Sequence, residues 1–335
     1  MKNQPLPRID ENPELQEKLL PFCRLQKGEI WEDKSKIFRV GCLDITKKQD
    51  VENLMNGEKA TLSIQDPPYN FIAFAEAEVD KFIDWCRIWT ENINSILSPD
   101  SSFYVWLGAD QRNGFQPLPD FMLMMRDVTN FKPRSFITMR NQRGFGTQKN
   151  WMAVRQELLY YTKGNPIFNI EAEYTDIPKI LRGYYKEVNG ETTENFERSK
   201  SENIRAGTVW VDIQQVFYRM DENVNGCYAQ KPLKCIERII QASSNENDLV
   251  VDFFSHSGTT MIASAKNKRR CFTMDIDPIF CEVTIRRIER FLETGKLGWQ
   301  NSNPFEEELG KGFLQMEETE LLNSKPKSKA QQTLF

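Results

Sequence analysis

The feature that most constrains the fold is a regular alternation of helices and strands between residues 232 and 295. Each apolar, β-prone run in this region is short and leads into a helical pattern. Strands that are joined through helices form parallel sheets, which helices cover on both faces. The pattern predicts a helix over Pro232–Ser243, a strand over Leu249–Phe254, a helix beginning at Met261–Lys266, a strand over Cys271–Ile276, and a helix capped by Asp277 that starts at Pro278 and ends before Gly295.

The preceding part of the chain has a similar rhythm. Five segments are predicted there: strands over Lys59–Gln65 and Ser102–Leu107, a helix over Val79–Leu97, and strands over Phe136–Arg140 and Glu157–Thr162 that flank a basic loop. Both halves together predict an α/β fold with a mixed, mainly parallel sheet. The expected organisation is a polar N-terminal segment on the surface (1–36), a first half of the main domain (37–164), a polar lobe (165–228), a second half (229–297) and a flexible tail (298–335), acidic and then lysine-rich.

Composition excludes several classes of protein. The single histidine, His256, excludes histidine-based zinc enzymes, and the seven cysteines contain no C-x-x-C pair that would indicate a zinc site or a redox motif. We therefore expect no metal. No apolar run is long enough for a membrane span, and the N-terminus lacks the apolar core of a signal peptide. A cytoplasmic protein is expected.

The charge is unevenly distributed along the chain. The formal net charge is −4, but residues 301–324 alone carry six glutamates and one lysine. Residues 131–163 instead carry seven basic side chains and a single acidic one, interleaved with aromatic residues. This pattern is typical of a solvated basic face, or of a surface that contacts phosphates and stacks on bases. The candidates for phosphate contacts are Arg140, Arg143, Lys149 and Arg155.

A first candidate site is Asp66-Pro67-Pro68-Tyr69, directly after the predicted strand that ends at Gln65. Open α/β sheets bind ligands at the carboxyl ends of their strands. The two prolines would fix a carboxylate, a carbonyl and an aromatic ring in space, which is the set of groups that an exocyclic amine of a flipped base requires. The same four residues could also form an ordinary proline turn.

A second candidate site is the loop from Asp252 to Thr260, which follows one strand and opens a helix. Its small side chains would let the backbone approach a bound cofactor. Asp275 lies 23 residues after Asp252, at the end of the next strand, where an acidic residue reaches ribose hydroxyls. Because no G-x-S-x-G motif accompanies His256, we expect this histidine to lie beside the cofactor rather than to act as a base.

Taken together, the motifs resemble those of the β-class DNA amino-methyltransferases, over roughly residues 27–295. Asp66–Tyr69 with Asn70 matches the catalytic motif of that family, and the loop at 252–260 matches its S-adenosylmethionine loop, usually D-P-F-x-G-S-G-T-T. The other matching segments are Arg39–Asp44 (similar to C-G-D), Glu157–Gly164, Gln230–Leu233 (QKPL) and Asp275. The chain departs from the family pattern at Leu43, Phe253 and His256. A residue other than glycine disfavours a positive φ. We therefore expect the backbone at Leu43 and His256, where the family has glycine, to differ most from the family pattern.

The resemblance implies a Rossmann-like S-adenosylmethionine-dependent methyltransferase with permuted motif order and a target-recognition insertion at 165–228. It implies methyl transfer to adenine N6 in DNA by base flipping, as part of a restriction–modification system in the cytoplasm of a prokaryote or phage. Asp66 and the Pro67 carbonyl would accept the two amine hydrogens, with Pro68 completing the motif and Tyr69 and Phe71 enclosing the base. The implied cofactor residues are Asp44, Asp66, Lys231, Asp252, Phe254, Ser255, His256, Ser257, Gly258, Thr259, Thr260 and Asp275.

Three alternative activities remain open at this point. Cytosine-N4 methylation shares the chemistry, although the motif S-P-P-Y tends to mark that branch and Asp66 therefore favours adenine. A DNA-binding subunit without catalysis and methylation of RNA or protein amides are the other two. The polar tail ends in Gln331, Leu334 and Phe335, which resemble the Q-x-x-L-F peptide that docks on the bacterial sliding clamp, or form an unstructured end. A homodimer is a further expectation.

Overall fold

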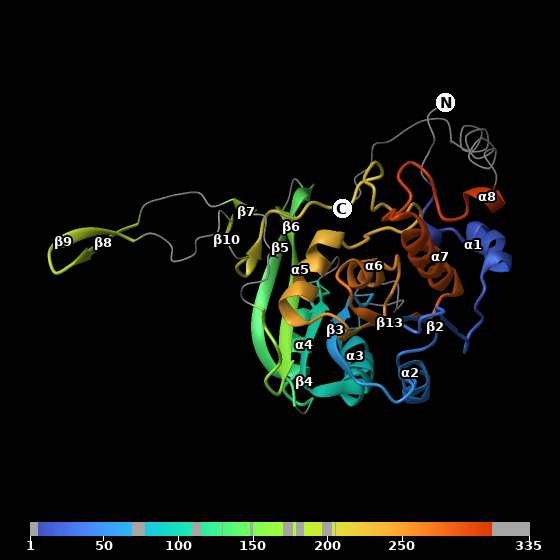
Figure 1. Cartoon of the computed structure of the whole chain (residues 1–335), viewed down its shortest axis with the longest axis horizontal. Coiled ribbons are helices and arrows are strands. Elements are labelled where there is room, and N and C mark those ends of the chain that lie inside the picture. The colour runs from blue at the N-terminus through green and yellow to red at the C-terminus, as the bar shows by residue number, and fades with distance from the viewer. Residues whose placement is uncertain are drawn as a thin grey trace.

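The computed structural model describes residues 6–68, 78–108, 115–128, 130–147, 150–169, 177–178, 184–195, 203–204 and 206–309. Within these ranges the main body is a nine-stranded mixed sheet with the order β1-β2-β13-β12-β3-β4-β6-β5-β11 (Figure 1). Five neighbouring strands, β2 to β4 in this order, are parallel, and β6 joins them antiparallel to β4. The strands are β1 (Ile30–Glu32), β2 (Phe38–Cys42), β3 (Ala60–Gln65), β4 (Leu97–Trp106), β5 (Lys132–Thr147), β6 (Asn150–Lys163), β11 (Val209–Trp210), β12 (Leu249–Asp252) and β13 (Arg270–Asp275).

Helices cover both faces of this sheet. In Figure 1, α5 (Leu233–Ser243), α6 (Thr259–Lys266) and α7 (Pro278–Thr294) lie above the central strands, and α2 (Lys48–Met55) and α3 (Val79–Ile96) lie below them. α4 (Leu118–Met124) packs into the same apolar cluster as α3. On α3 the buried side chains recur every three or four residues, as an amphipathic helix requires: Phe82, Cys86, Trp89 and Ile93. The predicted α/β architecture is confirmed.

The helix boundaries follow local signals that the sequence carries. The side chain of Asp277 caps α7 by accepting a hydrogen bond from the Ile279 amide at 2.8 Å, and Pro278 occupies the first turn. At the other end of α7, Gly295 adopts a φ of 72°, a left-handed conformation that glycine tolerates without steric penalty. Pro232 precedes the first turn of α5. Each of these ends lies within about one residue of the prediction.

The basic region differs from the prediction of two short strands around a loop. β5 and β6 form one long antiparallel hairpin whose pairing continues from Arg140↔Arg155 to Thr147↔Asn150. The register shift between Arg140 and Phe145 takes up additional residues of β5, and the shift between Phe145 and Thr147 takes up an additional residue of β6. Such irregularities let a ladder continue through a sequence whose glycines read as a loop.

The N-terminal segment also differs from the prediction of a purely surface position. Leu6, Ile9, Leu15 and Leu19 are buried, and α1 (Pro13–Leu19) is capped by Asn12, which accepts a hydrogen bond from the Leu15 amide at 3.0 Å. Short 3-10 turns flank α1 at Ile9–Glu11 and Leu20–Phe22. The buried leucines pack with residues of α7 and of the region after it, in a third apolar cluster that includes Val283, Trp299 and Phe305. The prediction failed because these few apolar residues are spread over segments whose composition is polar on average.

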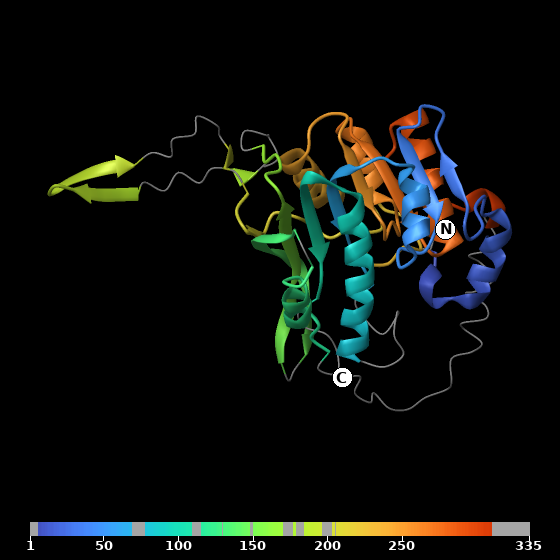
Figure 2. The same ribbon diagram turned by 90° about the horizontal axis from the view of Figure 1, so that it is seen from below.

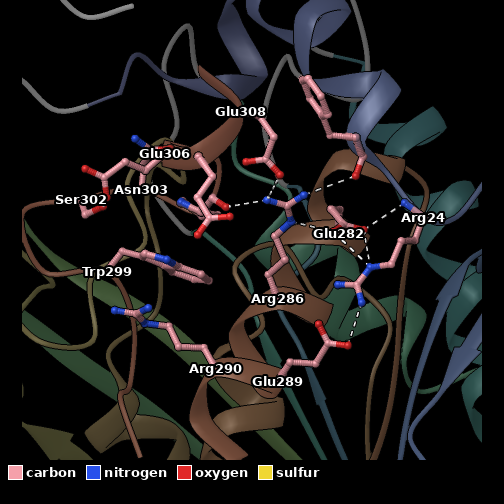
Figure 3. A pocket seen from close by; sticks show the side chains of 13 residues that line it. Arg24, Glu282, Arg286, Glu289, Arg290, Trp299, Ser302, Asn303, Glu306 and Glu308 are labelled. Atoms are coloured by element: carbon pink, nitrogen blue, oxygen red, sulfur yellow. Dashed lines mark hydrogen bonds and ion pairs between the residues drawn. The ribbon is translucent and has the colours of Figure 1, made fainter. Parts of the chain in front are cut away.

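Residues 299–309 belong to the packed body rather than to a tail, because Trp299 and Phe305 are buried and α8 spans Glu306–Leu309. A charged network fixes this region and the N-terminal segment to α7 (Figure 3). Arg286 bonds both Glu282 and Glu308 at 2.6 Å, and Arg24 reaches Glu282 at 3.1 Å and Glu289 at 2.7 Å. Burial raises the pKa of Glu282, but the hydrogen bonds from Arg24 and Arg286 outweigh it and leave this pKa lowered. The remainder of the predicted tail, residues 310–335, lies outside the described residues.

The predicted lobe at 165–228 is described only in part. Two small antiparallel pairs lie there, β7 (Ile177–Pro178) with β10 (Asn203–Ile204) and β8 (Tyr184–Val188) with β9 (Glu191–Asn195). β11 lies within the same stretch of sequence but joins the main sheet beside β5, where Trp210 is buried. Among the described residues, no helix is both long and apolar enough to cross a membrane.

Candidate cofactor and catalytic site

Three carboxylates meet at one edge of the sheet. Asp66 follows β3, Asp252 ends β12 and Asp275 ends β13, and these three strands are parallel neighbours. Asp44 follows β2, the next strand along the same edge. Because parallel strands present their carboxyl ends on one side, residues that are far apart in sequence come together there.

A small cavity opens at this edge between the loop after β12 and the start of α5. Nine of the twelve predicted cofactor residues line it, whereas Asp44, Gly258 and Asp275 lie outside its lining. Trp106, at the end of β4, also lines the cavity and was not predicted. In the sequence, Trp106 is one of several apolar residues in a predicted strand, so no motif distinguishes it as a site residue.

The loop from 252 to 260 has a left-handed backbone at two positions. His256 has a φ of 45° and Gly258 a φ of 72°. The amide of His256 donates to the carboxylate of Asp275 at 2.9 Å, and this bond offsets the strain of a non-glycine residue there. A Cβ at Gly258 would lie only 3.0 Å from the Thr284 hydroxyl on α7, so glycine also permits close packing.

The other departures from the family pattern also have a structural account. Leu43 is not among the residues with positive φ, and its amide donates to the Asp275 carbonyl at 3.0 Å. Leu43 therefore has no backbone strain of the kind that a positive φ would cause. Phe253 uses its amide to donate to the buried side chain of Gln65 at 3.0 Å, a bond that proline could not make. This bond ties the ends of β3 and β12 together.

Lys231 and Asp66 form an ion pair at the cavity. The Lys231 ammonium lies 2.6 Å from Oδ2 of Asp66 and 5.3 Å from the centre of the Trp106 ring, and its side chain is only 8% exposed. The second oxygen of Asp66, Oδ1, is buried and has no hydrogen-bond partner among the described residues. A buried acceptor without a donor is unfavourable by about 1–3 kcal/mol, so this oxygen is poised to accept a hydrogen bond from a ligand.

Burial shifts the titration of the groups around the cavity. It raises the pKa of Asp252 to about 7 and that of Asp275 to about 6, and it lowers the pKa of His256 to about 4. The His256 ring packs on Phe280, with ring centres 4.7 Å apart. A site with buried carboxylates and a neutral histidine suits a ligand that carries positive charge.

Arg287 of α7 binds the loop at 252–260. This role was not predicted from the sequence. The fully buried guanidinium of Arg287 donates to the Ser257 carbonyl at 2.8 Å, the Thr259 hydroxyl at 3.1 Å and the carbonyls of Glu222 and Leu297. It thereby joins the loop to the segment that leads to Lys231. A single arginine on the apolar face of a helix gives no advance sign of this role.

Two of the four predicted phosphate-contacting residues, Arg140 and Arg155, lie on the β5–β6 hairpin and outside the cavity lining. Arg140 and Arg155 are exposed and directly opposite each other in the ladder. The side chains of Arg143 and Lys149 lie outside the described residues, as does Tyr69 of the catalytic motif. Asp44 accepts hydrogen bonds from the amide and hydroxyl of Thr46 at 2.9 and 2.7 Å.

Comparisons with known proteins find relatives that align with more than two thirds of the chain. The chain is 25% identical over 284 residues to the type II methyltransferase M.BamHI of Bacillus amyloliquefaciens, in an alignment that covers 81% of this chain and 62% of that relative. It is 29% identical over 244 residues to YhdJ of Escherichia coli K12, covering 69% of this chain and 77% of that protein.

Solved structures share the fold at low sequence identity. PvuII DNA methyltransferase matches with a TM-score of 0.52 at 17% identity, over 74% of this chain and 85% of that one. TTHA0409 of Thermus thermophilus matches with a TM-score of 0.51 at 20% identity, over 77% and 96%. A family profile described as DNA methylase covers residues 60–286, which include the strands and loops that build the cavity. The chain therefore belongs to the N6/N4 DNA methylase family of S-adenosylmethionine-dependent enzymes.

Proposed function

We propose that this protein transfers the methyl group of S-adenosylmethionine to the N6 amine of adenine in DNA, after flipping the base out of the duplex. The observation that carries the proposal is the buried Oδ1 of Asp66 beside the cavity, which has no hydrogen-bond partner in the described part of the chain. The relative YhdJ is named a DNA adenine methyltransferase, which supports adenine. PvuII methyltransferase is described as cytosine-N4-specific, and that activity is the second candidate.

In the proposed reaction, Asp66 and the Pro67 carbonyl accept the two hydrogens of the amine. Its lone pair is otherwise delocalised into the ring, and the two acceptors localise it toward the methyl donor. Pro67 and Pro68 fix the backbone so that both acceptors are in place before the base arrives. Tyr69 stacks on the flipped base, with Phe71 as a second wall. Positioning and electrostatics account for most of the rate enhancement.

The cofactor, when bound, supplies an electrophilic methyl group. We propose that the loop residues Phe254, Ser255, His256, Ser257, Gly258, Thr259 and Thr260 hold it, together with Asp44, Asp252 and Asp275. Asp66 and Asp252, which line the cavity, and the half-buried Asp275 beside it suit the positive charges of this cofactor. Lys231 is the one lysine or arginine in the described lining and would bind a ligand carboxylate. Such a ligand competes with Asp66 for Lys231. The carboxylate of Asp66 is then available to the amine of the base.

The raised pKa values predict that the affinity for S-adenosylmethionine falls as the pH drops from 8 to 5.5. Asp252 and Asp275 bind protons in the free protein near pH 7 and 6, and a cationic cofactor favours their ionised forms. Since one pKa unit corresponds to about 1.36 kcal/mol, we expect about a tenfold loss of affinity. Titration calorimetry at pH 6.5, in buffers of different ionisation enthalpy, should show proton release. Binding without proton release at any pH would contradict this expectation.

The same shifts predict how the free protein responds to pH. Because both folded-state pKa values exceed the ordinary value of 3.8, the folded state binds more protons than the unfolded chain between about pH 4 and 7. Their contribution to the free energy of unfolding is therefore greatest at low pH and is lost as the pH rises through this window. Saturating cofactor should oppose that loss.

We further propose that Arg140, Arg143, Lys149 and Arg155 contact DNA phosphates and that residues 165–228 recognise the target sequence. The relatives named type II methyltransferases support a place in a restriction–modification system in a prokaryotic cytoplasm. Expression in a bacterial host, followed by sequencing with modified-base detection, tests the function as a whole. N6-methyladenine at one recurring sequence supports the proposal, whereas an unmodified genome contradicts it.

Docking on a sliding clamp through Gln331, Leu334 and Phe335 stays a prediction, because these residues lie outside the described part of the chain. A peptide of residues 324–335 should bind purified clamp in an anisotropy titration and lose binding when Leu334 and Phe335 are changed to alanine. A homodimer is likewise a prediction.

A further inference from the structure

The β5–β6 hairpin extends well past the edge of the sheet at which the candidate site lies. β6 runs antiparallel to β4, and Leu158 pairs with Trp106, the last residue of β4. Residues 150–157 therefore continue beyond that point, and at about 3.3 Å per residue they span about 26 Å. Asp66 lies at the same edge, because Gln65 pairs with Val105. Figure 2 shows the green hairpin passing beyond the neighbouring strand β4.

This projecting part of the hairpin carries Trp151, the most exposed of the large apolar side chains in the described residues, with 92% of its surface accessible. Two other aromatic residues of the basic region, Phe131 and Phe136, are less exposed. Phe131 is buried in the core, and Phe136 is about half exposed at 43%. A tryptophan with this exposed fraction on a projecting strand indicates a surface that meets a partner.

Two arginines lie opposite each other on the same hairpin, in an arrangement that is unfavourable for the free protein. Arg140 and Arg155 are directly opposite each other across the ladder, and like charges at such positions repel. Both are exposed, and Arg155 also pairs with the buried Glu157 at 2.7 Å. Arg155 and Trp151 are four residues apart on β6. An anionic partner would relieve the repulsion between the arginines.

We propose that residues 140–147 and 150–155, here called the distal ribbon, lie along a groove of the DNA duplex and that Trp151 inserts there against the face of a base whose stacking is opened. This inference rests on the proposed function. A two-stranded ribbon fits the major groove, which is about 12 Å wide, and the ribbon is long enough to cross it. A second copy of this chain is disfavoured as the occupant of the ribbon, since a symmetric contact would bring four arginines together.

The test compares binding of a mixed-sequence DNA duplex by full-length variants, using anisotropy over a range of salt concentrations. Trp151→Ala should weaken binding about tenfold, the scale of one lost base–aromatic stack, with the salt dependence unchanged. Trp151→Phe should restore most of the affinity. Arg155→Ala should instead lower the slope of log affinity against log salt by about one. Leu292→Ala and Lys268→Ala are the matched controls, because both residues are exposed on other parts of the molecule.

Quenching of tryptophan fluorescence by DNA should also be smaller in Trp151→Phe than in wild type. If Trp151→Ala binds DNA and methylates it as wild type does, the inference is wrong while the proposed function stands. If Trp151→Ala changes the sedimentation of the protein but not its DNA binding, the ribbon contacts protein and the inference is equally wrong. Absence of methyl transfer by wild type would instead contradict the proposed function.

Discussion

Replacing Asp66 by alanine is expected to lower the rate of methyl transfer by at least about a hundred- to a thousandfold, the scale for removing one group that stabilises a transition state. The reason is that Oδ1 of Asp66 is the buried acceptor beside the cavity that has no partner among the described residues. DNA binding should stay close to wild type, since Asp66 is assigned to the amine and not to a phosphate. Tritiated methyl transfer and a gel shift on one duplex measure both quantities.

The controls for this experiment follow from the ion pair with Lys231. Alanine leaves that buried ammonium without its carboxylate, which destabilises the fold, so thermal unfolding must be measured alongside. Asp66→Asn keeps an oxygen acceptor but removes the charge, and it separates the two contributions. Asp127→Ala is the matched control, because Asp127 is an exposed aspartate far from the cavity lining. Retained turnover in a folded Asp66→Ala protein would refute the assignment.

Replacing Asp275 by alanine is expected to weaken S-adenosylmethionine binding by about 1.5–3 kcal/mol, the range for hydrogen bonds to a charged group. The carboxylate of Asp275 also accepts the amides of His256 and Asp277 at 2.9 and 3.1 Å. Its loss therefore removes the proposed ribose contact and also frees His256 from the backbone conformation with a φ of 45°. Calorimetric titration of the purified protein gives the affinity directly.

Asp277→Ala provides a matched comparison two residues away. Its side chain caps α7, so its removal should lower the free energy of unfolding by about 1 kcal/mol and leave cofactor affinity nearly unchanged. Asp275→Asn keeps one acceptor oxygen and should fall between wild type and alanine. If Asp275→Ala binds the cofactor as tightly as wild type, the ribose is held elsewhere.

The sequence predicts best those helices and strands whose ends are determined by neighbouring residues. Asp277, Pro278 and Gly295 mark the ends of α7 through caps and backbone preferences that depend on neighbouring residues only. The hairpin shows the opposite case. Its glycines read as a loop, and only pairing between distant residues makes them part of a ladder. The buried N-terminal leucines were likewise decided by partners near the other end of the chain, including Trp299 and Phe305.

The candidate site likewise has some residues that motifs predict and others that only contacts between distant segments bring into place. Motifs located Asp66, Asp252 and Asp275, because each follows a strand that the sequence marks. The contact between Lys231 and Asp66 joins residues 165 positions apart, and the buried role of Arg287 depends on three separate segments. The left-handed backbone at His256 opposes local preference and is held by the Asp275 carboxylate. Local rules are expected to fail at such strained functional positions.

The central claim is that the Asp66 site methylates the N6 amine of adenine. Its most direct test is to incubate purified protein with labelled S-adenosylmethionine and unmethylated DNA, digest the DNA to nucleosides and separate them by chromatography. The account predicts label in N6-methyl-2′-deoxyadenosine with wild type, and at least about a hundredfold less of it with Asp66→Ala. Label in N4-methyl-2′-deoxycytidine, or equal label with Asp66→Ala, would contradict it.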